Sequence, residues 1–159
     1  MTKIKIKFSF LVFNALIFLL RDSEIICAFY IACISHELGH ITAIKLTGGE
    51  LKCIELSCFG IKITASPYSS LKNGIFVLLS GPAVNLLLYI IFKMLQIDAP
   101  FTMFNLAEGL FNLLPYSMLD GGAVMNLIAE GSIYEKQLNI IYFIIRIITA
   151  VVIVALLIL

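Results

Sequence analysis

Long apolar runs separated by short polar breaks dominate the chain. Apolar stretches long enough to enter or span a bilayer lie at residues 8–20, 24–46, 74–94, 101–114 and 139–159. A shorter apolar stretch ends near residue 129, and Gly and Pro mark several of the breaks. The pattern therefore predicts an α-helical polytopic membrane protein with about five to six membrane helices.

Two other segments alternate between apolar and polar residues with a period of two. KIKIKF occupies residues 3–8, and two short alternating runs flank Gly60 within residues 50–65. Such alternation is typical of strands with one apolar face. We therefore expect an N-terminal strand at 3–8 and a β-hairpin at about 50–65, which together form a small sheet at the membrane surface.

Composition agrees with a membrane protein. Apolar residues make up 61% of the 159 residues and charged residues 13%, against about half and a quarter in soluble domains. A chain of this length has the size of one domain. Residues 1–159 are therefore predicted to form a single domain without an appended regulatory domain. The net charge is +1, and no basic patch exceeds what the flanks of membrane spans need, so we expect no nucleic acid as a partner.

Lysines gather on one side of the predicted spans. No small-residue cleavage pattern follows the first apolar run, so we expect it to stay as a membrane anchor. The positive-inside rule then places the N-terminus, the hairpin and the C-terminal end of the 24–46 helix in the cytosol. The lysines on that side are Lys3, Lys5, Lys7, Lys45, Lys52, Lys62 and Lys72.

The sequence HELGH lies inside the second apolar run and contains both histidines of the chain, His36 and His40. On a helix, HExxH places two imidazoles on one face, where they can hold one Zn²⁺. Glu37 is offset from that face but can reach a metal-bound water and take its proton. Ionisable groups inside a span cost about 2.5–3.5 kcal/mol each on insertion scales, so this placement indicates function.

A catalytic zinc site usually has three protein ligands, and no third histidine exists. The candidates at membrane depth are Asp120, Glu108 and Cys33. Chemistry favours Asp120, which follows an irregular stretch and precedes two glycines. Its alternative role is the N-cap of the following helix.

The four cysteines, Cys27, Cys33, Cys53 and Cys58, lack disulfide-type spacing, so we expect free thiols.

Three motifs together resemble the site-2 protease family of intramembrane zinc metalloproteases. They are HELGH at 36–40, SGPAVN at 80–85 and NLLPYSMLDGG at 112–122. The segment GGELKCIELSCFG resembles the family's membrane-associated hairpin, and the short form resembles its sporulation-type branch. The resemblance covers roughly residues 3–130.

The resemblance implies one zinc ion held by His36, His40 and Asp120, with Glu37 as the general base. It implies an endopeptidase that hydrolyses a bond in or near a transmembrane segment, close to the cytosol. The substrate would be a membrane protein such as a membrane-bound transcription factor, an anti-sigma factor or a pro-sigma factor. Regulatory membrane partners or a homo-oligomer are the other expected partners.

Asn85 and Asn112 match asparagines of the family's motifs. Either amide could position the substrate backbone or stabilise an oxyanion, and the alternative is a hydrogen bond between membrane helices. Glu108 departs from the family, which has a small or apolar residue there. We expect Glu108 to pair with Arg146, to be protonated or to line the substrate path.

Two other functions fit parts of the sequence. A non-catalytic metal-binding membrane protein, such as a sensor or a transporter component, would need His36, His40 and Asp120 but not Glu37. A membrane zincin that cuts soluble peptides or prenylated tails usually uses Glu or His as its third ligand, which the LDGG turn disfavours.

Overall fold

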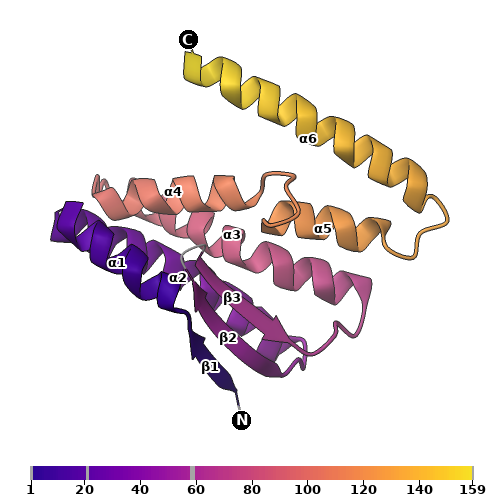
Figure 1. The fold of residues 1–159 in the computed structure, drawn as a ribbon, viewed down its shortest axis with the longest axis horizontal. Helices are drawn as coiled ribbons and strands as arrows, with labels where there is room; N and C mark the ends of the chain where they lie inside the picture. Colours follow the sequence, from indigo (N-terminus) through magenta and orange to yellow (C-terminus); the bar gives the residue numbers. More distant parts are fainter. Residues whose placement is uncertain (1, 21, 58–59, 159) are drawn as a thin grey trace.

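The computed structural model describes residues 2–20, 22–57 and 60–158, and within these ranges the chain forms six helices and three strands (Figure 1). The strands are β1 (Lys3–Ile6), β2 (Leu51–Ser57) and β3 (Gly60–Ala65). The helices are α1 (Phe8–Leu20), α2 (Ser23–Leu46), α3 (Leu71–Met94), α4 (Pro100–Asn112), α5 (Asp120–Ala129) and α6 (Glu135–Ile158).

Three of the described helices are long and apolar enough to cross a bilayer, namely α2, α3 and α6. Helix α1 is apolar but shorter, with 13 residues, and α4 and α5 are also short. The protein is therefore a mostly helical membrane protein, as the sequence predicts. The number of five to six membrane helices stays a prediction, because length and composition alone support three.

The predicted strand and hairpin join into one sheet with the order β1-β2-β3. β1 pairs with β2 in parallel, and β2 pairs with β3 in antiparallel register. Lysines project on one face of the sheet, where Lys7 lies 2.7 Å from Glu55 and holds the pKa of that carboxyl below its usual range. On the apolar face, Ile63 and Ala65 pack against the core of α2 and α3. The small sheet is thus confirmed.

The helices that carry the motifs pack closely because small residues lie where they cross. A β-carbon at Gly39 of α2 would come 2.7 Å from the carbonyl oxygen of Ser80 in α3. Similarly, a β-carbon at Gly109 of α4 would come 2.9 Å from the Leu86 side chain of α3. Small residues let membrane helices approach at backbone distance, so these crossings bring HELGH, SGPAVN and the end of α4 together.

The helix bounds differ slightly from those the sequence predicts. Helix α3 begins three residues earlier than expected, because the Ser70 hydroxyl caps it. This hydroxyl accepts a hydrogen bond from the backbone N–H of Asn73 at 3.2 Å. Helix α6 likewise begins at Glu135 rather than at 139. Helix α4 ends at Asn112, two residues before the predicted end, and Pro115 follows in the loop.

Candidate metal centre

The HELGH motif lies in the second half of α2, where both imidazoles are buried. His36 is 4% exposed and His40 is 8% exposed. The spacing of four residues places them one turn apart on the same helix face, and their Nε2 atoms lie 3.1 Å from each other. The helix alone thus provides two nitrogen atoms that face one point.

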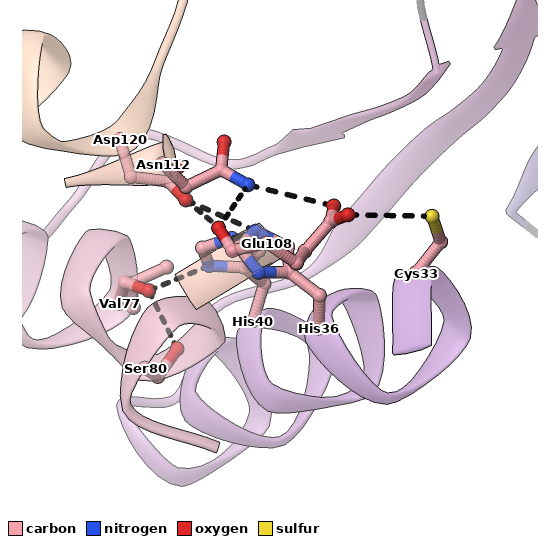
Figure 2. A network of polar contacts seen from close by, with 8 residues as sticks. All are labelled: Cys33, His36, His40, Val77, Ser80, Glu108, Asn112 and Asp120. Atoms are coloured by element: carbon pink, nitrogen blue, oxygen red, sulfur yellow. Dashed lines mark hydrogen bonds and ion pairs between the residues drawn. The ribbon is translucent and has the colours of Figure 1, made fainter. Parts of the chain in front are cut away.

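Asp120, the first residue of α5, completes a triangle of donor atoms with these nitrogens (Figure 2). Its Oδ2 lies 3.0 Å from Nε2 of His36 and 3.2 Å from Nε2 of His40. Bonds of about 2.0–2.1 Å to a tetrahedral zinc ion place neighbouring ligand atoms about 3.3 Å apart. The three side chains therefore fit a zinc ion, although Asp120 lies 84 residues after His36 and 80 residues after His40 in the sequence.

A backbone carbonyl fixes the orientation of the His40 ring. Nδ1 of His40 lies 2.8 Å from the Val77 oxygen, and a carbonyl oxygen can only accept, so Nδ1 carries the proton. In the neutral ring, Nε2 is then the unprotonated nitrogen that a metal requires, an arrangement common among metal-binding histidines. Nδ1 of His36 is buried and has no hydrogen-bond partner among the described residues.

Gly81 of the SGPAVN segment covers the two imidazoles. A β-carbon at position 81 would come 2.8 Å from Nε2 of His36 and closer still to Nε2 of His40. Any larger residue would therefore push into the donor atoms. The sequence shows this glycine in a motif, but only the folded structure shows that its missing side chain leaves room for the ligands.

The loop between α4 and α5 places Asp120. Gly121 and Gly122 lie against the carbonyl groups of Leu113 and Tyr116, and a β-carbon at either glycine would overlap them. The backbone of α5 can approach the loop this closely only because of these two glycines. The alternative role of Asp120 as an N-cap is wrong: Leu119 occupies that position, and the Asp120 side chain contacts the histidines instead.

Glu37 follows His36 directly and is half-buried. No hydrogen bond or ion pair joins its carboxylate to another residue in the described part of the chain, and it lies within electrostatic range of His36, His40 and Asp120. A carboxylate beside the donor triangle but outside it is free to exchange a proton with a water molecule.

Glu108 and Cys33 lie beside the triangle and outside it (Figure 2). The thiol of Cys33 donates to Oε2 of Glu108 at 3.6 Å, and the Asn112 amide donates to the Glu108 carbonyl at 3.1 Å. The expected pairing of Glu108 with Arg146 is wrong, because the Arg146 guanidinium contacts Pro115 and Asn126 instead. Of the three candidates for third ligand, the structure brings only Asp120 to both histidines.

The asparagines occupy different surroundings. Asn112 is half-buried near Glu108, whereas Asn85 is fully buried in α3, and neither polar atom of its amide has a partner among the described residues. Substrate positioning by either residue stays a prediction. Among the cysteines, Cys27, Cys33 and Cys53 are free, as expected, and Cys58 lies outside the described residues.

Two contacts that support the site could not be predicted from the sequence. The Val77 carbonyl that orients His40 leaves no signal, because every residue has a carbonyl group. Arg146 could be recognised as unusual from its charge inside a span, but its partners could not.

No protein-family model matches the chain. A curated protein of Synechocystis sp., described as a "Putative zinc metalloprotease", is 33% identical over 108 residues. That match covers 60% of this chain, and the chain spans only 28% of the length of that relative.

A solved structure, the site-2 protease from Methanocaldococcus jannaschii, superposes with a TM-score of 0.69 at 21% identity, covering 83% of this chain and 69% of that one. The fold is therefore that of a site-2 protease. Together the two comparisons confirm the resemblance to the site-2 protease family that HELGH, SGPAVN and LDGG indicate in the sequence.

Proposed function

We propose that the protein is a zinc-dependent intramembrane endopeptidase that hydrolyses a peptide bond in or near a transmembrane segment of a membrane-associated substrate. The observation that carries the proposal is the convergence of His36, His40 and Asp120 within 3.0–3.2 Å beside Glu37. His36, Glu37 and His40 lie on α2, a helix long and apolar enough to cross a bilayer, where such groups are retained for function rather than stability.

His36, His40 and Asp120 would hold one zinc ion. A bound zinc ion lowers the pKa of water at its open position and polarises a carbonyl group. Glu37 then accepts the proton of the attacking water and later transfers it to the leaving amine, as one residue commonly does in both steps. The hydrogen bond from His40 to the Val77 carbonyl keeps the imidazole in place throughout.

A substrate helix must unwind before cleavage, because its own hydrogen bonds shield each amide. The sheet offers a place for the extended segment, since β1 and β3 are its outer strands in the described part of the chain. We favour the edge of β3, because Ile63 and Ala65 pack against the buried cluster that contains Val77, whose carbonyl orients His40. An added strand there would gain backbone hydrogen bonds near the donor triangle.

The proposed cellular setting rests on the lysines near the ends of the spans and on the family resemblance. The lysines favour a multi-pass protein with the site toward the cytosol. The resemblance of the short form to the sporulation-type branch favours a bacterial cell membrane. Suitable substrates would be membrane-bound transcription factors, anti-sigma factors or pro-sigma factors. Regulatory membrane proteins or further copies of the chain are the partners we expect besides the bilayer.

The test compares the wild-type protein with Glu37→Gln, each reconstituted in vesicles with a panel of tagged single-span peptides that contain helix-breaking residues. Zinc content is measured by elemental analysis, and products are identified by mass spectrometry. We expect both proteins to carry one zinc ion per chain, and we expect only the wild type to cleave. Chelation of zinc should abolish that cleavage.

Two outcomes would contradict the proposal. Turnover by Glu37→Gln at the wild-type rate would remove Glu37 from the role of base. Stoichiometric zinc without cleavage of any peptide by the wild type would instead support a non-catalytic metal-binding membrane protein.

A further inference from the structure

Arg146 is a charged residue at the centre of α6, the most apolar of the three described helices that are long enough to cross a bilayer. It is the twelfth of 24 residues in α6, and its sequence neighbours are isoleucines that are mostly exposed. A charge at this depth is costly, and such a residue usually faces protein with a polar partner. Arg146 is half-buried, so its partners explain why the residue is there.

Those partners lie on both sides of Asp120 in the sequence. Nε of Arg146 donates to the Pro115 carbonyl at 2.6 Å, and Nη2 donates to Oδ1 of Asn126 at 2.9 Å. The Tyr116 hydroxyl also donates to the Arg146 carbonyl at 3.4 Å. The guanidinium thus connects the loop that leads into α5 with a side chain from the second turn of that helix.

The loop needs such a connection. It has irregular backbone between α4 and α5, and carbonyl groups at membrane depth require partners from the protein. Pro115 interrupts the helical pattern, and the guanidinium satisfies its carbonyl. An arginine suits this task because its planar group presents several donors in a fixed fork, whereas a lysine presents a single mobile ammonium.

The position of the loop sets the position of the third donor atom. Gly121 and Gly122 press against the Leu113 and Tyr116 carbonyls so closely that no β-carbon fits. Any shift of the loop is therefore passed to Asp120, whose Oδ2 must stay within about 0.5 Å of its place to complete a metal site. Figure 1 shows α6 lying apart from the sheet and beside α5, so this contact reaches the site from the outermost helix.

We propose that Arg146 is a positioning residue for the metal site: its guanidinium clamps the two segments that flank Asp120 and thereby sets the affinity for zinc. The inference rests on the proposed zinc site, but it assigns a role to α6 that the cleavage chemistry does not require. It concerns the geometry of Asp120 and involves no contact between Arg146 and the ion or the substrate.

The experiment measures zinc affinity by chelator competition in the purified full chain for wild type, Arg146→Gln and Arg146→Lys. Changes outside the direct ligands typically weaken metal affinity by 10–100-fold, so we expect about a tenfold loss for Arg146→Gln. Arg146→Lys keeps the charge but can hold only one of the two acceptors well, and it should lose less. Thr149→Val is the matched control, because its hydroxyl bonds only the Ile145 carbonyl of its own helix.

Two further measurements separate positioning from folding. The absorption spectrum of the cobalt-substituted protein should change in Arg146→Gln and stay unchanged in Thr149→Val, because cobalt reports the arrangement of its ligands. If Arg146→Gln does not fold, Asn126→Ala removes one acceptor of the same clamp and should weaken zinc binding in a smaller step. If Arg146→Gln folds, the double variant Arg146→Gln/Asn126→Ala should lose little more zinc affinity than Arg146→Gln alone, as expected for residues that share one interaction.

A folded Arg146→Gln protein with wild-type zinc affinity and an unchanged cobalt spectrum would overturn the inference. If Arg146→Gln does not fold, wild-type zinc affinity in Asn126→Ala would overturn it. Failure of the wild type to bind zinc would instead overturn the proposed function and this inference with it. The two failures are thus distinguishable in one set of titrations.

Discussion

Gly81 lies so close to the His40 imidazole that a β-carbon at position 81 would overlap Nε2. The hydrogen bond from Nδ1 to the Val77 carbonyl prevents the ring from moving away freely. A residue of α3 that offers no side chain thus controls the space around two donor atoms of α2. This relationship makes position 81 a direct test of the metal site.

Replacement of Gly81 by alanine should weaken zinc binding by at least about tenfold, in the range typical of changes next to metal ligands. Chelator competition measures the loss. Gly109→Ala is the matched control: its β-carbon would meet the Leu86 side chain, 2.9 Å away, at another helix crossing. Gly109→Ala should overpack this crossing and lower the free energy of unfolding by about 1–3 kcal/mol. It should leave the zinc affinity unchanged. Equal zinc loss in both variants would contradict the prediction.

Asp120→Asn should reduce zinc affinity by more than the roughly 10–100-fold that outer-shell changes cause, because it removes the charge of a direct ligand. Glu108→Gln and Cys33→Ser are the controls, since both side chains lie beside the donor triangle and contact each other. Elemental analysis after dialysis gives the metal content of each protein. Retained zinc in Asp120→Asn together with lost zinc in either control would reassign the third ligand.

Zinc should stabilise the folded protein against heat. The donor atoms of His36, His40 and Asp120 converge to within 3.0–3.2 Å in a largely buried site that only the folded chain forms. A ligand that binds only the folded state at 100 times its Kd raises the free energy of unfolding by about 2.7 kcal/mol. Thermal unfolding in detergent micelles, with zinc or with chelator, measures this difference. The shift should disappear in Asp120→Asn, and an equal shift in that variant would place the bound zinc elsewhere.

Asn112→Ala should impair cleavage without loss of zinc. Its amide is half-buried near Glu108, to whose carbonyl it donates, and it lies outside the donor triangle. If Asn112 positions the substrate, kcat/KM should fall by about 10²-fold, comparable to the loss of one oxyanion donor. Steady-state cleavage and elemental analysis test both parts. Unchanged kcat/KM would leave Asn112 with the structural role of a hydrogen bond within α4.

The sequence by itself determined the local elements and half of the site. Alternation with a period of two predicts strands at 3–8 and 50–65, and the structure has β1, β2 and β3 there. The predicted end of the first strand is wrong, because β1 stops at Ile6 and Phe8 already begins α1. The i, i+4 spacing of His36 and His40 places two imidazoles on one helix face, whatever the helix packs against. These features depend on backbone geometry within a short segment, so a local pattern is sufficient to predict them.

Tertiary structure alone decided which groups complete the site. Residue type and depth left Asp120, Glu108 and Cys33 as candidates, with Asp120 favoured by its irregular surroundings. Packing of α5 against α3 brings Asp120 to the histidines while Glu108 turns toward Cys33. Arg146 likewise binds Pro115 and Asn126 rather than Glu108. The choice among such partners depends on contacts between helices far apart in the sequence and on backbone carbonyls such as that of Val77, which no residue type reveals.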